Sequence, residues 1–136
     1  MTTPPSSIRT YMTESPHSIA PDATIAKAHE VMRALGVRHL PVIEDGRLLG
    51  TVSQRDLAIM ETLPGVEPNE VPVEDAMATD VYTASPDAPL QHVATEMAAR
   101  KLGSAVIMDG KDVIGIFTTT DALQAHTQLM GLIGMP

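Results

Sequence analysis

The chain carries one chemically suggestive pattern twice, Gly-x-x-Ser/Thr-x-x-Asp. It reads Gly50-Thr-Val-Ser53-Gln-Arg-Asp56 in the first half and Gly115-Ile-Phe-Thr118-Thr-Thr-Asp121 in the second. In both halves the pattern falls where a strand is expected to turn into a helix. A helix N-terminus presents free N–H groups and a partial positive charge, which suit a phosphate. A carboxylate one turn later can accept from two hydroxyls, as a ribose presents them. The pattern is therefore compatible with a nucleotide site in each half.

The same residues have a second interpretation, in which they only cap a helix. Serine or threonine followed three residues later by an acid is the capping-box pattern, in which each side chain accepts a hydrogen bond from the other residue's backbone N–H. Capping and binding are compatible, because a capping side chain can rotate toward a ligand. The sequence leaves both interpretations open.

The two patterns belong to an internal repeat. When the chain is shifted by 65 residues without a gap, eight of the 46 positions from Met12 to Leu57 are identical. Average residue frequencies would give roughly three. The identities include Met12 with Met77, Met32 with Met97, Gly50 with Gly115 and Asp56 with Asp121. A repeat of this length predicts two similar units, with the matched residues as candidates to line a cleft between them.

Each unit is predicted to follow the order β-α-β-β-α in an α/β (α+β) fold. Short extended pieces are expected at 16–19 and 82–83, helices near 24–35, 54–61, 89–101 and 119–130, and hairpin strands at 37–43, 48–52, 104–108 and 113–117. Residues 8–12 are expected to form a short helix or turn. Along the chain we expect a disordered tail (1–7), a first repeat (8–62), a linker (63–73), a second repeat (74–130) and an apolar C-terminal tail (131–136). This last tail is expected to pack on its own domain or on a second subunit.

Composition narrows the class of protein. The net charge of −8 argues against a nucleic-acid partner, because phosphate binding needs a basic face. Most of the cations lie early: six Lys or Arg stand against seven Asp or Glu up to Thr62, and three against ten from Leu63. There is no cysteine, no apolar run of membrane-spanning length and no signal-peptide pattern. We therefore expect a cytoplasmic protein without a membrane partner.

Further motifs carry a family resemblance. Met12-Thr-x-x-Pro16, Val37-Arg-His-Leu-Pro-Val-Ile43-Glu-Asp-Gly, Val52-Ser-x-Arg-Asp-Leu57 and, in the second repeat, Ile114-Gly-Ile-Phe-Thr-Thr-Thr-Asp121 resemble the CBS domain, named for cystathionine β-synthase. The resemblance covers about residues 8–125. It implies a tandem pair forming one compact Bateman module with pseudo-two-fold packing, often dimerised. It also implies that an adenine nucleotide or S-adenosylmethionine binds in the cleft between the repeats.

The resemblance assigns roles to particular residues. Asp56 and Asp121 would hold the ribose, and Ser53 and Thr118 would lie near phosphate or ribose. The expected binding set is Ser18, Arg38, His39, Pro41, Ser53, Arg55 and Asp56 in the first repeat, and Thr83, Ser104, Thr118, Thr120 and Asp121 in the second. Lys27, Arg33 and Arg47 are expected to be solvated surface charges.

The repeats differ within this set. Arg38-His39 is replaced by Gly103-Ser104, Pro41 by Val106 and Arg55 by Thr120. Because a phosphate site needs cations, we expect one site to bind an adenine nucleotide appreciably and the other to be weak or empty.

Two functions follow as alternatives. The first is a stand-alone regulatory module that senses AMP, ADP, ATP or S-adenosylmethionine and signals by a conformational shift, either to an effector protein or within a homodimer. The second is a nucleotide-free structural or interaction dimer whose motifs only cap helices. We expect no enzyme and no required cofactor, because no nucleophile–base pair, paired-carboxylate site or phosphate-loop lysine is present. The five histidines have no metal-ligand spacing, so no metal site is expected.

Overall fold

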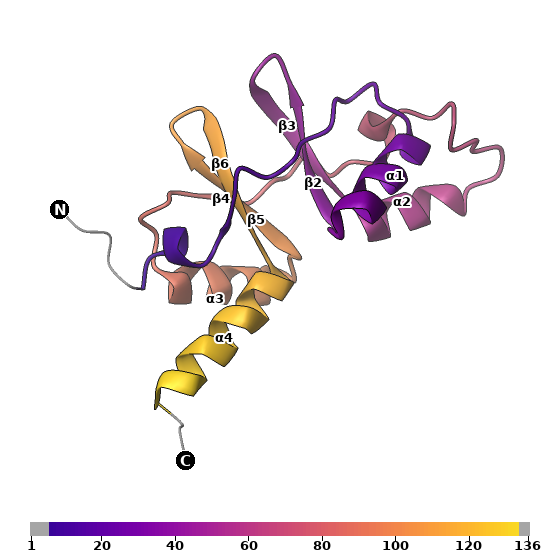
Figure 1. Cartoon of the computed structure of the whole chain (residues 1–136). Coiled ribbons are helices and arrows are strands. Elements are labelled where there is room, and N and C mark those ends of the chain that lie inside the picture. The colour runs from indigo at the N-terminus through magenta and orange to yellow at the C-terminus, as the bar shows by residue number, and fades with distance from the viewer. Residues whose placement is uncertain (1–5, 134–136) are drawn as a thin grey trace. The chain divides into compact units, whose positions relative to one another are not determined.

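The computed structural model describes residues 6–133, which form two compact units (Figure 1). Residues 16–81 make up what we call the first-repeat unit. Residues 6–15 and 82–133 make up the second-repeat unit. Each unit is a mixture of helices and strands, which confirms the predicted fold class.

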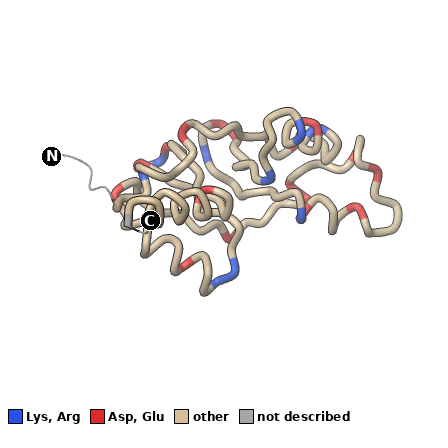
Figure 2. Tube along the Cα trace, turned by 60° about the horizontal axis from the view of Figure 1, so that its bottom comes forward, with Lys and Arg blue, Asp and Glu red and all other residues tan. Residues whose placement is uncertain are grey.

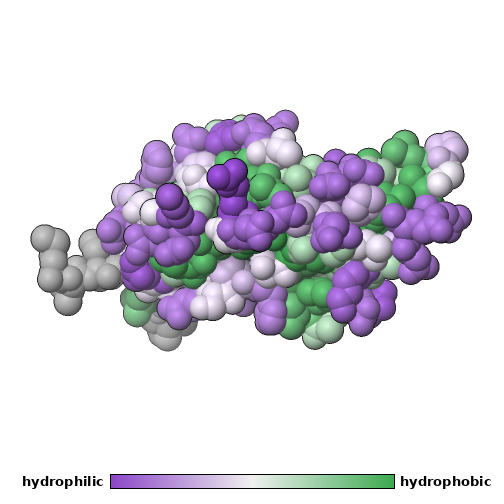
Figure 3. All heavy atoms as spheres, turned by 90° about the horizontal axis from the view of Figure 1, so that it is seen from above, coloured by the Kyte–Doolittle hydropathy of each residue, from purple (hydrophilic) through white to green (hydrophobic). Residues whose placement is uncertain are grey.

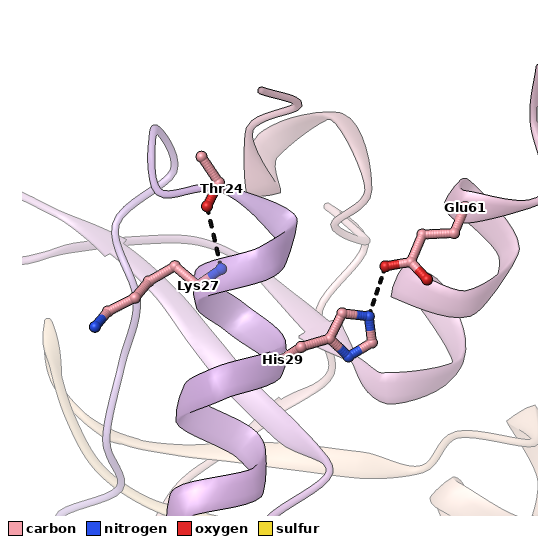
Figure 4. Close-up of polar contacts among 4 residues, drawn as sticks. All are labelled: Thr24, Lys27, His29 and Glu61. Carbon is pink, nitrogen blue, oxygen red and sulfur yellow. Dashed lines mark hydrogen bonds and ion pairs between the residues drawn. The ribbon is translucent and has the colours of Figure 1, made fainter. Parts of the chain in front are cut away.

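The first-repeat unit contains α1 (Ile25–Leu35), β2 (His39–Glu44), β3 (Arg47–Ser53), α2 (Gln54–Glu61) and a short 3₁₀ turn, η2 (Val73–Asp75). Thr24 caps α1 by accepting from the Lys27 N–H at 3.1 Å (Figure 4), and Gly36 ends the helix with φ +67°. β2 and β3 form the predicted hairpin. Positive φ values at Asp45 and Gly46 give the two-residue turn that such a hairpin requires.

The second-repeat unit contains η1 (Ile8–Thr10), β1 (Thr13–Glu14), β4 (Thr83–Ala84), α3 (Leu90–Arg100), β5 (Ser104–Asp109), β6 (Asp112–Thr118) and α4 (Thr119–Ile133). Its sheet has the order β1-β6-β5-β4. The pair β4–β5 is parallel and the other pairs are antiparallel.

The first-repeat unit has the same sheet in a shorter form. Ile19 bridges Val42 in parallel, where β4 would stand, and Ala78 bridges Thr51 in antiparallel fashion, where β1 would stand. The 65-residue shift maps the Ala78–Thr51 bridge onto the pairing of Thr13 with Ile116 in β1 and β6. Each hairpin is therefore completed by a segment that precedes the other repeat in the sequence.

Because of this pairing, the boundaries of the two structural units differ from the boundaries of the two sequence repeats. The sequence assigned residues 8–62 to the first repeat, but residues 8–15 belong to the second-repeat unit. Backbone hydrogen bonds from Ile8 to Ala88 (2.8 Å) and from Ser15 to Ile114 (3.0 Å) hold them there. The expected linker, 63–73, packs on the first-repeat unit, because Val71 accepts from the first free N–H of α1, on Ile25, at 3.0 Å.

The predicted terminal tails lie partly outside the described residues, which exclude 1–5 and 134–136. The last two residues of the first tail, Ser6 and Ser7, are packed rather than disordered. The Ser6 carbonyl accepts from the Leu90 N–H at 2.6 Å, and Ser7 is buried. Gly131 to Ile133 continue α4 rather than forming a separate tail.

Each unit has its own hydrophobic core. The first-repeat core gathers Ile25, Ala28 and Met32 from α1 with Leu40, Val42, Val52, Leu57 and Val73. The second-repeat core gathers Ile8, Val93, Met97, Ala105, Ile107 and Phe117. Ile8 and Val73, which the 65-residue shift aligns, are both fully buried. The two short 3₁₀ turns are thus parts of the cores.

Charged residues of both signs are interspersed along the chain (Figure 2). The stretch from Glu61 to Asp80 contains six acidic residues and neither Lys nor Arg. The cations of the first-repeat unit therefore lie on the hairpin, on its approach and on the two helices, at Lys27, Arg33, Arg38, Arg47 and Arg55.

Apolar residues also reach the surface. The face in Figure 3 shows green patches among hydrophilic residues, and on α4 Leu123 and Leu132 are 68% and 79% exposed. A contiguous exposed apolar patch marks a contact surface, whereas single exposed apolar side chains are common in folded proteins. Within residues 6–133, none of the helices has the length and apolar character to cross a membrane.

Candidate functional site

The first motif lies where β3 runs directly into α2. Ser53 is the last residue of β3 and lies opposite His39, the first residue of β2. The Gln54 N–H, at the start of α2, donates to the Arg38 carbonyl at 2.9 Å. Hairpin register and this single hydrogen bond thus bring Arg38, His39, Ser53 and Asp56 to the same end of the first-repeat unit.

Ser53 and Asp56 form a complete capping box. The Ser53 hydroxyl accepts from the Asp56 N–H at 3.1 Å, and Asp56 Oδ2 accepts from the Ser53 N–H at 2.8 Å. Among the described residues, no hydrogen bond to Asp56 Oδ1 is found. The cap therefore uses one oxygen of this half-buried carboxylate and leaves the other for a donor from outside the chain.

The second motif has the same cap and one more contact. Asp121 Oδ2 accepts from the Thr118 N–H at 2.9 Å and from the Thr118 hydroxyl at 3.2 Å, while the Asp121 N–H donates to Thr118 Oγ1 at 3.3 Å. In addition, the Thr13 hydroxyl donates to Asp121 Oδ1 at 3.1 Å and to Oδ2 at 3.3 Å. Both oxygens of Asp121 thus already accept hydrogen bonds. Thr13 was not among the residues predicted from the sequence.

The glycine of each motif is explained by a close approach. A Cβ at position 50 would lie 2.5 Å from the Ala78 carbonyl oxygen and 3.0 Å from Met77 Sδ. At position 115 it would meet the Met12 side chain, with Cγ at 3.0 Å. Glycine at these positions therefore allows the pairing segment to lie against the hairpin. The 65-residue repeat aligned Met12 with Met77, but the alignment did not identify which residues these methionines contact.

The other predicted residues of the first-repeat unit lie around this end of the hairpin in different environments. Pro41 is buried in β2, and its carbonyl accepts from the Ile19 N–H at 2.9 Å, next to the exposed Ser18. Arg38 and Arg55 are exposed, one before β2 and the other in the first turn of α2.

In the second-repeat unit the predicted residues follow the same plan. Ser104 lies opposite Thr118 in the β5–β6 hairpin, and Thr83 pairs with Val106 across β4 and β5. Thr120 is exposed in the first turn of α4. The expectation that the two sets line one shared cleft stays a prediction.

A hollow of about 300 Å³ lies beside the first motif. It is lined by His29, Met32, Arg33, Gly36, Val37, Arg38 and Gln54, all of the first-repeat unit. His29 Nε2 lies 2.7 Å from Glu61 Oε1, joining α1 to α2 (Figure 4). Two guanidinium groups at one hollow suit an anion. Arg33 is exposed, as the sequence predicted, and it lines the same hollow as Arg38, which its helical spacing did not indicate.

His39 is the titratable group most affected by this environment. Burial lowers its pKa from 6.5, and Arg38 acts in the same direction, whereas the Asp56 carboxylate raises it to a smaller extent than burial lowers it. The imidazole is therefore neutral at neutral pH. A neutral imidazole offers one donor and one acceptor rather than a charge.

We expect this shift to appear in the pH dependence of folding. Because the folded-state pKa is below the unfolded value, His39 stabilises the fold fully above about pH 6.5. That contribution is lost as the pH falls through the folded-state pKa. Urea denaturation at pH steps from about 7.5 to 5 should show wild type losing more stability than His39→Gln. His17→Gln controls for the removal of an exposed imidazole. Equal pH profiles for wild type and His39→Gln would contradict the assignment.

The site's side chains offer groups that an organic anion can use. In the part of the chain that the structure describes, His, Asp and Glu residues form no group of three or more able to hold a metal ion. The arrangement of capped helix starts, guanidinium groups and a neutral imidazole suits an organic anion bearing hydroxyl groups.

Together these observations define a class of protein: a tandem-repeat α+β chain with β-α-β-β-α units and a strand-to-helix Gly-x-x-Ser/Thr-x-x-Asp motif in each. Residues 8–60 and 73–127 both match the CBS domain family. The chain belongs to the CBS-domain family, as a tandem pair, which confirms the resemblance drawn from its motifs.

Similar proteins support this assignment. A CBS domain-containing protein of Bacillus subtilis, YhcV, is 29% identical over 116 residues, covering 85% of this chain and 82% of YhcV. The crystal structure of AcuB from Vibrio cholerae has a TM-score of 0.84 and 30% identity, and the match covers 96% of each chain. The CBS domain pair of protein MJ0100, crystallised with 5′-methylthioadenosine and S-adenosylmethionine, shares the fold with a TM-score of 0.81 at 23% identity, over 90% of this chain and 96% of that one.

Proposed function

We propose that this chain is a regulatory CBS pair that binds an adenosyl ligand, of the group AMP, ADP, ATP and S-adenosylmethionine. The observation that carries the proposal is the Asp56 carboxylate at the start of α2, which has one oxygen outside its cap and lies beside Arg38 and His39. The complex of the MJ0100 pair with adenosyl compounds supports the same ligand class.

The ribose and the anionic group of such a ligand each have a proposed partner in the first-repeat unit. The ribose hydroxyls donate to Asp56, and the neutral His39 accepts or donates one hydrogen bond. A phosphate or carboxylate is held by Arg38, by Arg33, which also lines the hollow, and by Arg55 in the first turn of α2. Ser18, Pro41 and Ser53 complete this set. In the second-repeat unit the corresponding residues are Thr83, Ser104, Thr118, Thr120 and Asp121.

Signalling follows from differential affinity. A ligand that binds one conformation more tightly shifts the population toward that conformation, and a partner then responds to it. We propose a homodimer in the cytoplasm as the working form, with a separate effector protein as the reader and no catalytic step. Leu123 and Met130, seven residues apart and so on one face of α4, are exposed and available for subunit contact.

A ligand panel tests the proposal. Purified protein is melted with AMP, ADP, ATP or S-adenosylmethionine, each over a concentration series. A ligand at 100 times its dissociation constant should raise the free energy of unfolding by about 2.7 kcal/mol. Guanosine and cytidine monophosphates serve as controls for a purely electrostatic effect of phosphate. If no adenosyl compound stabilises the protein more than these controls, the proposal is wrong.

The second candidate function is an interaction dimer in which the motifs only cap helices. It is favoured by the complete capping hydrogen bonds of both motifs, which satisfy the N–H groups of Ser53 and Thr118 without a ligand. A panel without any specific stabilisation, combined with a dimer in sedimentation analysis, would favour this function.

A further inference from the structure

The two motif aspartates, Asp56 and Asp121, differ in the hydrogen bonds that their carboxylates already accept. Asp121 accepts from Thr118 and, through both carboxylate oxygens, from the Thr13 hydroxyl. Asp56 accepts through Oδ2 from the Ser53 N–H. A carboxylate has about four acceptor positions shared between two oxygens. Asp56 can therefore accept two new hydroxyl donors, whereas Asp121 must first release Thr13.

One side chain accounts for this difference. Under the 65-residue shift Thr13 aligns with Ala78, which has no hydroxyl. The backbone around the two residues is equivalent: Thr13 pairs with Ile116, and Ala78 pairs with Thr51. The preceding methionines, Met12 and Met77, also contact equivalent glycines. The asymmetry thus comes from the exchange of threonine for alanine rather than from a different path of the chain.

We propose that Thr13 is a specificity-determining residue, whose hydroxyl stands in for a ligand hydroxyl on Asp121 and so directs a vicinal diol such as ribose to Asp56. The inference rests on the proposed function. It is distinct from the loss of cations in the second repeat, because that loss weakens phosphate binding, whereas Thr13 acts on the sugar.

A neutral nucleoside separates these two effects, because it has a diol but no phosphate. We would titrate ¹⁵N-labelled protein with adenosine and follow the backbone amide signals of Ser53 and Asp56 for one motif and of Thr118 and Asp121 for the other. This readout names the occupied motif even at millimolar affinity. The same titration with 2′-deoxyadenosine, which lacks one hydroxyl of the diol, shows whether the diol is required.

Reciprocal variants test the role of the hydroxyl. Thr13→Val keeps the β-branched shape on β1 and removes the donor, and Ala78→Thr introduces the donor beside Asp56. In wild type we expect adenosine to shift the Ser53 and Asp56 signals. In Thr13→Val the Thr118 and Asp121 signals should also shift, and Thr13→Ser should restore the wild-type pattern. In Ala78→Thr, adenosine affinity at Asp56 should fall about fivefold, the effect of one net hydrogen bond.

The outcomes distinguish the two proposals. If adenosine shifts the Ser53 signals and Thr13→Val leaves the Thr118 signals unmoved, the role of Thr13 is wrong while the proposed function stands. Equal shifts at both motifs in wild type would also overturn the role of Thr13. If adenosine moves neither motif in wild type or in Thr13→Val, the role of Thr13 is wrong, and the ligand panel decides the proposed function separately. Both exchanged positions are exposed, so the variants are expected to fold, and a thermal melt of each checks this.

Discussion

Replacing Gly50 by alanine is expected to destabilise the first-repeat unit by about 3 kcal/mol or more. The new Cβ would lie 2.5 Å from the Ala78 carbonyl oxygen, closer than real Cβ atoms come to their neighbours. Overpacking of this kind costs about 1–3 kcal/mol, and more when the backbone must move. A total stability of about 5–15 kcal/mol makes this a large fraction. Urea denaturation followed by circular dichroism measures the change.

The Ala78 carbonyl cannot move away from the new Cβ without weakening its backbone hydrogen bonds. It accepts from the Thr51 N–H at 2.9 Å, and the Ala78 N–H donates back to the Thr51 carbonyl at 2.8 Å. Relieving the clash would stretch this pair, which fixes Ala78 against β3. The cost therefore combines steric overlap with lost backbone hydrogen bonds.

Gly115→Ala is the matched control in the other repeat. There the new Cβ meets side-chain atoms of Met12, and a methionine side chain can adopt another rotamer. We expect about 1 kcal/mol of destabilisation. Met12→Ala should then relieve Gly115→Ala, whereas Met77→Ala should not relieve Gly50→Ala, as double-mutant cycles can test. Equal costs at the two glycines would contradict the distinction between backbone and side-chain contact.

The elements of this fold were predictable because local signals set them. Thr24 caps α1 and Gly36 ends it, and the buried positions Ile25, Ala28 and Met32 follow the helical period. Asp45-Gly46 provided the two positive φ values of the first hairpin turn. These features need no knowledge of distant contacts, so their chemistry is visible in a short stretch of sequence.

The pairing of Thr13–Glu14 and of Ala78 with the hairpins was not predictable. β1 has two residues, and its counterpart at Ala78 is a single bridge, so neither has a periodicity that marks a strand. The repeat aligned Met12 with Met77 but carried no information about which hairpin each one contacts. The pairing partners of β1 lie about a hundred residues away in the sequence. Tertiary contacts therefore determine which hairpin β1 joins.

The motif residues of the candidate site could be predicted from the sequence. A residue that contacts them could not. The motif identified Ser53, Asp56, Thr118 and Asp121, because their spacing is the one that caps a helix start and can also bind a ligand there. Thr13 stands in the Met12-Thr-x-x-Pro16 motif, but that motif gave it no role in the site, because its partner Asp121 is 108 residues away.

Asp56→Asn is expected to remove most of the ligand's effect while leaving the fold nearly intact. Asparagine keeps one oxygen to accept from the Ser53 N–H, so capping is largely preserved. It loses the charge that strengthens hydrogen bonds from ribose hydroxyls, each worth about 1.5–3 kcal/mol. A hundredfold loss of affinity would lower the stabilisation from about 2.7 to about 0.4 kcal/mol at the same ligand concentration. Thermal melts with the most strongly stabilising adenosyl compound measure this.

Two matched variants separate the loss of a ribose acceptor from a general loss of negative charge. Asp45→Asn, in the hairpin turn, removes one negative charge away from the motif and should leave ligand stabilisation unchanged. Asp121→Asn alters the equivalent cap in the second repeat, where Thr13 already occupies the carboxylate, and should have a much smaller effect on the ligand. If Asp56→Asn keeps the full ligand stabilisation, Asp56 does not hold the ribose and its role is capping alone. If Asp56→Asn and Asp121→Asn reduce it equally, the two motifs bind alike, and the asymmetry inferred from Arg38, His39 and Thr13 does not govern ligand choice.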